Sequence, residues 1–232
     1  MIITRSKSHW EKPELWTHGY HSQQVVRFQG LTIDIIGTKY SYISIGKVAS
    51  TFMTKFLEKL NYPEIIYDYN IEDEYRLPQT YIVVLRDPIE RWCSGIVEYL
   101  VNNRKFRGND SMTFNLKDRE TLDLIFGYAI FDRHTCPQVD YLHNIDTDQC
   151  VFFKLDKDFE NNIRRFTEKE LNVPTNNVII SDNMYNTSER DTHKELREVI
   201  NFEINDNPRY LEQIKSHFVD DIILYNSVNY YE

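Results

Sequence analysis

The hydrophobic and polar positions along this chain follow two periods, one typical of strands and one typical of helices. Short runs rich in β-branched and aromatic residues, bounded by polar or glycine-containing turns, predict strands. The predicted strands are Leu31–Ile36, Tyr40–Ile45, Thr80–Leu85, Cys150–Leu155 and Asn177–Ile180. Because Thr80–Leu85 is apolar along most of its length, we expect it to be buried on both faces, as in a parallel sheet.

Longer segments have apolar residues three and four positions apart, which predicts amphipathic helices. The first begins near Ser50, and Pro88 stands near the first turn of the second, where proline is well tolerated. The predicted helices are Ser50–Leu60, Ile89–Val101, Arg119–Phe131, Asp158–Leu171 and two or three more between Thr192 and Asn226. Two stretches lack both periods and predict loops, namely the acidic residues 61–79 and the basic residues 103–117.

The alternation of strands and helices predicts an α/β fold with a central, mainly parallel sheet flanked by helices. A length of 232 residues fits a single domain. Residues 1–30 show no clear period and predict an irregular N-terminal arm, so we expect the domain to comprise residues 31–232. Ligands of such sheets bind at the carboxyl ends of the strands, which selects the loops after Ile45 and Leu85 as candidate sites.

Charge and composition narrow the class of partner. A formal net charge of −9 argues against a nucleic-acid binder, since such proteins carry a basic face. The N-terminus lacks the apolar segment of a signal peptide, and no apolar run is long enough to cross a bilayer. The three cysteines are odd in number and form no CxxC pair, so they indicate no disulfide framework. We therefore expect a cytoplasmic protein without a membrane span or a nucleic-acid partner. The sequence leaves its oligomeric state open.

The segment Ile45–Thr51 has the pattern of an anion-binding loop. A predicted strand leads into a turn at Gly46 and Lys47, and a helix begins near Ser50. The first N–H groups of that helix and its dipole favour an anion at the turn, and Lys47 adds a positive charge. An ordinary strand-to-helix turn with an exposed lysine fits this segment about as well.

The loop differs from the Walker A pattern of nucleotide-dependent kinases. That pattern places Ser or Thr directly after the lysine, where the hydroxyl binds Mg²⁺. Here Val48 follows Lys47, and Ser41 stands where the first glycine belongs. The sequence therefore favours phosphate or phosphosulfate binding without that metal ligand.

The segment Arg86–Tyr99 carries a second candidate anion site. Arg86 ends a predicted strand, and Ser94 falls about two turns into the following helix. A guanidinium and a hydroxyl placed there suit a second phosphate. Asp87 is expected to cap the helix. We interpret Glu90 and Arg91 as solvated surface charges.

In this order, the two segments resemble the donor site of the sulfotransferases that use 3′-phosphoadenosine-5′-phosphosulfate (PAPS). The first is similar to that family's 5′-phosphosulfate loop, PKxGST or PKVAST, except that Gly46 replaces the proline. The second is similar to its 3′-phosphate motif, RDPxxRxxSxY. The resemblance is closest to the branch that includes the Golgi carbohydrate sulfotransferases. Weaker similarities cover Asp132–Gln138, Val151–Phe159 and residues 185–188.

The resemblance implies a P-loop-kinase-like sulfotransferase architecture and PAPS as the donor, with PAP as the product. It implies that Lys47 contacts the phosphosulfate and stabilises charge on the leaving phosphate. It further implies that Arg86 and Ser94 bind the 3′-phosphate. The implied donor-binding residues are Gly46, Lys47, Val48, Ala49, Ser50, Thr51, Arg86 and Ser94. No metal is expected, because the transferred group carries less negative charge than a phosphoryl group.

The acceptor and the general base are less well defined. The resemblance implies a hydroxyl of a small molecule or glycan as the acceptor. We expect His134 to be the base, because it lies in the segment similar to the family's HxxPQ, although a structural histidine packed on Pro137 fits equally. Glu98 and the acids of residues 72–74 are alternatives, and His18 and His21 could line an acceptor cleft. Two other functions stay open, a nucleotide-dependent kinase of related fold and a non-catalytic nucleotide-binding module.

Overall fold

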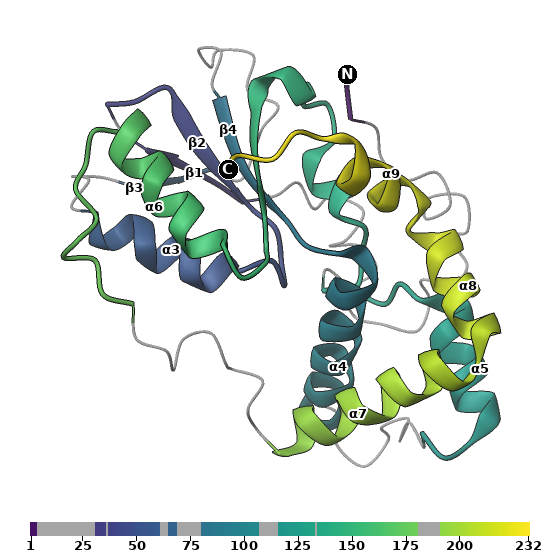
Figure 1. Cartoon of the computed structure of the whole chain (residues 1–232). Coiled ribbons are helices and arrows are strands. Elements are labelled where there is room, and N and C mark those ends of the chain that lie inside the picture. The colour runs from purple at the N-terminus through teal and green to yellow at the C-terminus, as the bar shows by residue number, and fades with distance from the viewer. Residues whose placement is uncertain are drawn as a thin grey trace.

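The computed structural model describes residues 1–3, 31–35, 37–60, 65–68, 80–106, 116–132, 134–180 and 191–232 (Figure 1). Within these ranges five strands form one sheet with the order β3-β1-β2-β4-β5. The strands are β1 (Leu31–Ile35), β2 (Tyr40–Ser44), β3 (Ile65–Asp68), β4 (Thr80–Leu85) and β5 (Cys150–Lys154). β1 is antiparallel to both of its neighbours, while β2, β4 and β5 are parallel to one another. Four of the five described strands thus run the same way.

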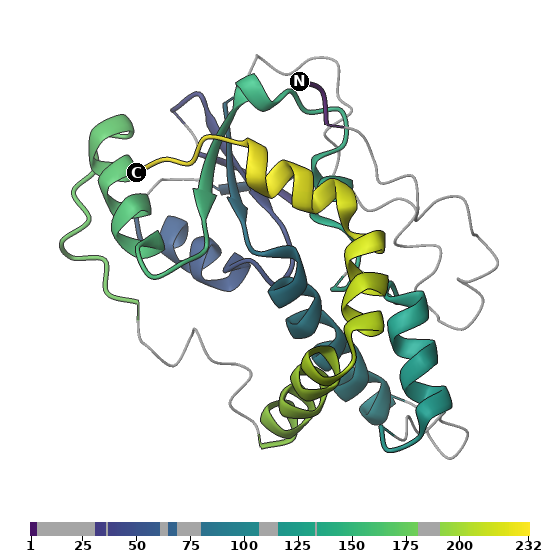
Figure 2. The same cartoon turned by 45° about the vertical axis from the view of Figure 1, so that its right-hand side comes forward.

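Helices cover the sheet and extend beyond it. They are α3 (Ser50–Lys59), α4 (Pro88–Phe106), α5 (Arg119–Tyr128), α6 (Phe159–Glu170), α7 (Asp191–Asp206), α8 (Pro208–His217) and α9 (Val219–Ser227), with 3₁₀ turns η2 (Gln138–Leu142) and η3 (Thr147–Gln149). In Figure 2, α3 and α6 lie on one side of the strands and α9 lies on the other. The rings of Phe52 in α3 and Phe159 in α6 pack 5.6 Å apart, which joins these two helices over the sheet.

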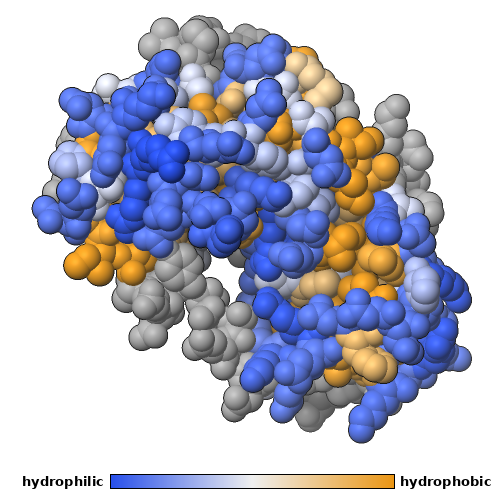
Figure 3. All heavy atoms as spheres, viewed as in Figure 1, coloured by the Kyte–Doolittle hydropathy of each residue, from blue (hydrophilic) through white to orange (hydrophobic). Residues whose placement is uncertain are grey.

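The hydrophobic core has two parts. One part surrounds the sheet and includes the buried faces of α3 and α6. The other lies between α4, α5, α7 and α8, where Phe126 and Tyr210 stack with ring centroids 4.2 Å apart. α4 begins beyond the carboxyl end of β4 and runs into this helical part, so it connects the two (Figure 1). Hydrophobic surface gathers mainly on the side of the molecule where α8 and α9 lie (Figure 3). Val219 and Ile223 in α9 are exposed.

These features confirm the predicted single α/β domain with a mainly parallel sheet. α3 begins at Ser50 as predicted, and its apolar face is buried. Of the predicted arm, Met1–Ile3 are described, and Ile3 pairs its backbone with Ile145. In the described part of the chain, none of the helices combines the length and the apolar character needed to span a membrane.

Two predicted elements are wrong. The predicted loop 61–79 contains strand β3, which is ordered by pairing with β1 and not by its own hydrophobic pattern. Asn177–Ile180 forms no strand, because Val178 donates its N–H to Thr175 in a turn. The guanidinium of Arg164 donates hydrogen bonds to the carbonyl oxygens of Thr175 and Val178, at 3.0 and 2.9 Å.

Two helix ends also differ from the prediction. α4 continues to Phe106, five residues beyond the predicted end, into the stretch predicted as a loop. α5 ends at Tyr128 and not at Phe131. Ala129 has a φ of 54°, and its N–H closes the last turn on Ile125.

Candidate functional site

The loop between β2 and α3 has an unusual backbone at two residues. Lys47 and Ala49 have φ values of 67° and 57°, in the left-handed region that residues with a Cβ rarely adopt. Ala49 is the residue before α3 and offers no side-chain cap to the first N–H groups of the helix, and the first turn carries no acidic residue. Those donors and the helix dipole therefore favour an anion at this end of α3.

Arg91 is completely buried and binds the backbone of this loop. Its Nε donates to the carbonyl oxygen of Gly46 at 2.9 Å, and its Nη1 donates to the carbonyl oxygen of Cys136. Its guanidinium also lies over the ring of Tyr141, 5.6 Å from the centroid. The interpretation of Arg91 as a solvated charge is therefore wrong. The two carbonyl groups and the ring replace part of the water that a surface arginine would bind, while Nη2 has no hydrogen-bond partner among the described residues.

A buried carboxylate accompanies Arg91. Asp221 in α9 accepts the backbone N–H groups of Gln138 and Val139, at 2.7 and 2.9 Å. Burial raises the pKa of Asp221, while the charge of Arg91 and these N–H groups act in the opposite direction. Arg91 and Asp221 thus form an internal frame that fixes the turn before η2 against the loop at Gly46.

Arg86 lies at the carboxyl end of β4, beside the end of β2, because these two strands are parallel neighbours. Gln138 fixes its backbone, donating to the Arg86 carbonyl at 2.9 Å and accepting the Arg86 N–H at 3.0 Å. Nε of Arg86 lies 3.5 Å from Oε2 of the exposed Glu90. Asp87 accepts the N–H groups of Ile89 and Glu90, both at 3.0 Å, which confirms the predicted cap of α4.

A second arginine lies next to Arg86. Arg197 in α7 donates from Nη2 to Oγ of Ser94 at 3.4 Å. Burial lowers the pKa of Arg86, Glu90 counteracts this effect, and the nearby charge of Arg197 lowers it further. Two guanidinium groups and a hydroxyl therefore form a cationic cluster at the start of α4.

Lys47 forms an ion pair with a residue of α4. Its Nζ lies 3.0 Å from Oε2 of Glu98, and Nε2 of His193 lies 3.3 Å from the same oxygen. Ser94 and Glu98 are one turn apart on α4, and Arg197 and His193 are one turn apart on α7. The packing of α4 against α7 thus forms two neighbouring polar contacts. Arg197 meets Ser94 at the predicted 3′-phosphate position, and His193 meets Glu98 beside Lys47 of the predicted phosphosulfate loop.

The sequence does not single out Arg197, and it offers His193 only as one of seven histidines, of which His134 is the favoured base. Both fall in the predicted helical tail, and their four-residue spacing places them on one face of a helix. That spacing is the only signal they give. Which residues they meet depends on the packing of α7 against α4.

His134 lies in a turn that packs on α4. A Cβ added to Gly95 would lie 2.1 Å from the carbonyl oxygen of His134, so this close approach requires glycine. Nδ1 of His134 contacts Oδ2 of Asp132 at 2.7 Å. No hydrogen bond joins His134 to Lys47, two residues that the structure describes.

The other predicted residues divide into three groups. The side chain of Val48 is buried in the core, so only its backbone can reach a ligand, whereas Thr51 is exposed and Ser50 partly so. His18, His21 and the segments 72–74 and 185–188 lie outside the described residues.

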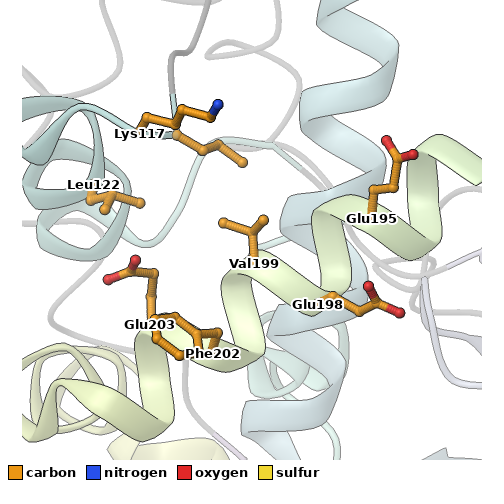
Figure 4. A pocket seen from close by; sticks show the side chains of 8 residues that line it. Lys117, Leu122, Glu195, Glu198, Val199, Phe202 and Glu203 are labelled. Carbon is orange, nitrogen blue, oxygen red and sulfur yellow. The ribbon is translucent and has the colours of Figure 1, made fainter.

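A shallow hollow of about 520 Å³ between α5 and α7 contains none of the predicted residues; Lys117, Val199 and Phe202 are among those that line it (Figure 4).

Among the described residues no group of three His, Cys, Asp or Glu side chains is arranged to hold a metal ion. Comparison of the chain with protein-family models, with curated proteins and with solved structures finds no match.

Proposed function

We propose that this chain transfers a sulfuryl group from PAPS to an acceptor hydroxyl, with a carbohydrate or glycan as the favoured acceptor class. The observation that carries the proposal is the pairing of two cationic positions at the ends of neighbouring parallel strands. Lys47 and the start of α3 follow β2, and Arg86 with Ser94 and Arg197 follows β4. A nucleotide with phosphates at both its 5′ and 3′ positions matches two such positions.

The 3′-phosphate is assigned to Arg86, Ser94 and Arg197. Two guanidinium groups held close together repel each other, and a dianion between them removes that cost. A nucleotide without a 3′-phosphate leaves the repulsion in place. This cluster therefore accounts for selection of PAPS over nucleotides that carry phosphate only at the 5′ position.

The 5′-phosphosulfate is assigned to the loop from Gly46 to Thr51. Its backbone N–H groups and the hydroxyl groups of Ser50 and Thr51 bind the phosphate, and Lys47 exchanges its contact with Glu98 for the bridging oxygen. Fixed donors of this kind stabilise charge where it develops in the transition state, and losing one typically costs about 10²–10³ in rate.

In the transfer step the acceptor oxygen attacks sulfur in line with the bridging oxygen. A bond forms between the acceptor oxygen and sulfur, and the bond between sulfur and the bridging oxygen breaks. The electron pair of that bond remains on the 5′-phosphate of PAP, opposite the charge of Lys47. The acceptor proton passes to a base of the protein, a role we assign to His134. Glu98 is the second candidate, because it already contacts Lys47 at 3.0 Å.

The kinase alternative is less consistent with the loop. It requires a hydroxyl directly after the lysine, and that position holds Val48, whose side chain is buried in the core. A non-catalytic module is harder to separate from an enzyme by geometry. It predicts binding of PAP without turnover of PAPS.

The test is thermal unfolding with PAP, adenosine 5′-phosphate, ATP with Mg²⁺, or no ligand. The proposal predicts stabilisation by PAP that exceeds stabilisation by adenosine 5′-phosphate at equal concentration, since only PAP carries the 3′-phosphate. Stabilisation by ATP with Mg²⁺ and not by PAP contradicts it. A screen of hydroxyl acceptors with labelled PAPS then separates an enzyme from a non-catalytic binder.

A further inference from the structure

Asp132 and His134 form a close acid–histidine pair. Oδ2 of Asp132 lies 2.7 Å from Nδ1 of His134, and Oδ1 accepts the backbone N–H of the same residue at 2.8 Å. The side chain of Asp132 is 10% exposed, whereas that of His134 is 20% exposed. The carboxylate is thus buried behind the ring, and the ring itself retains access to solvent.

The pair is fixed against the candidate donor site in two ways. The turn that carries it packs on Gly95, directly after Ser94, at a distance that excludes any larger residue. The guanidinium of Arg91 donates one hydrogen bond to the carbonyl of Cys136, two residues after His134, and another to the carbonyl of Gly46. One buried side chain therefore connects the histidine turn to the residue that precedes Lys47.

The carboxylate is held by several donors besides the ring. The backbone N–H of Thr135 donates to Oδ1 of Asp132 at 3.2 Å, and Thr135 Oγ1 lies 3.3 Å from the same oxygen. These contacts all involve Oδ1, so among the described contacts Oδ2 is directed to the ring. A carboxylate oxygen that faces the ring serves as a hydrogen-bond acceptor for a ring N–H.

We infer that Asp132 is a positioning residue that holds the proton of neutral His134 on Nδ1, which leaves the lone pair of Nε2 to accept a proton. This inference rests on the proposed function, and it gives His134 its role in that reaction. The acceptor O–H donates its proton to Nε2 as the bond to sulfur forms. The resulting imidazolium carries an N–H on each nitrogen, and the Nδ1–H remains paired with Asp132.

The substitution Asp132→Asn tests this role without removing the turn. Oδ1 of asparagine can still accept the two backbone N–H groups, but its amide group donates to Nδ1 and so moves the proton of neutral His134 to Nε2. The matched control is Asp118→Asn, because Asp118 caps α5 by accepting the N–H groups of Glu120 and Thr121 and makes no hydrogen bond or ion pair with any of the described histidines.

Two measurements decide the inference. Nitrogen-15 NMR of histidine-labelled protein reports which ring nitrogen of His134 carries the proton, with His134→Gln identifying the signal. We expect Nδ1 to be protonated in the wild type and in Asp118→Asn, and Nε2 in Asp132→Asn. In labelled-PAPS assays we expect kcat of Asp132→Asn to fall at least about 100-fold with the KM for PAPS unchanged.

The outcomes separate this inference from the proposed function. Protonation of Nε2 in the neutral wild-type ring overturns it, and this measurement needs no variant to fold. Unchanged kcat in Asp132→Asn together with active wild-type protein also overturns it, while leaving sulfuryl transfer intact. Absence of transfer by the wild type to every acceptor tested contradicts the proposed function. The NMR measurement still decides whether Asp132 sets the position of the proton.

Discussion

Lys47 and Glu98, which are 51 residues apart in the chain, form an ion pair with a distance of 3.0 Å between Nζ and Oε2. Neither side chain is fully buried, and Glu98 also contacts the buried His193. If Lys47 binds phosphosulfate, this pair has to separate, so Glu98 competes with the donor for the amine.

We therefore predict that Glu98→Gln binds PAP more tightly than the wild type does. Exposed ion pairs contribute about 0.2–1 kcal/mol, which corresponds to a gain of up to about fivefold in affinity. Isothermal titration calorimetry measures this change, with the exposed Glu195→Gln as the charge-matched control. Weaker binding by Glu98→Gln would show instead that Glu98 orients Lys47 toward the donor.

Substitution of Lys47 itself separates catalysis from binding. Lys47→Ala should lower the rate of sulfuryl transfer at least about 100-fold, because the amine no longer stabilises charge on the leaving phosphate. PAP should still bind through the cationic cluster of Arg86, Ser94 and Arg197. The exposed Lys194→Ala serves as the control, and wild-type turnover in Lys47→Ala would refute the assignment of this lysine.

The two arginines are expected to act on the same phosphate. Arg86→Ala and Arg197→Ala should each weaken PAP binding about ten- to hundredfold, since hydrogen bonds to charged groups contribute about 1.5–3 kcal/mol. Binding of adenosine 5′-phosphate should change little. Equal losses for both ligands would mean that these residues do not recognise the 3′-phosphate, and the exposed Arg165→Ala controls for net charge.

We expect Arg91 to increase the free energy of unfolding of the protein. Arg91→Met removes the donors to Gly46 and Cys136 and leaves Asp221 buried without its positive neighbour. Leaving a buried acceptor without its donor typically costs about 1–3 kcal/mol of the free energy of unfolding. Urea denaturation measures this loss, with Arg165→Met as the surface control, and a loss below about 1 kcal/mol would contradict the role of Arg91.

The three cysteines should be inert in the native protein. Burial raises the pKa of the thiol groups of Cys93, Cys136 and Cys150 to about 12 in each case. At pH 8 only about one thiol in ten thousand is then a thiolate, the form that reacts with iodoacetamide. Mass spectrometry should find no labelling at pH 8 before unfolding and three labels in urea. Rapid labelling of any one cysteine in the native state would contradict the burial argument.

Several features of the site followed from the sequence alone. The start of α3 at Ser50, its buried apolar face and the Asp87 cap of α4 each depend on residues within a few positions of one another. Such local patterns are set by backbone geometry and by helical periodicity, so neighbouring residues suffice to predict them. The order of strands and helices likewise indicated that the loops after β2 and β4 would lie at adjacent strand ends.

Only the tertiary structure revealed how the side chains of these loops are held. Arg91 is buried because Gly46 and Cys136, each 45 residues away along the chain, present carbonyl groups to it. Arg197 reaches Ser94 across 103 residues through the packing of α7 on α4. Thus the sequence by itself determined most of the helices and strands and the two candidate anion positions, but not strand β3 or the turn at Val178. The long-range packing decided which charges are buried and which meet, because those contacts depend on chain segments that no local pattern relates.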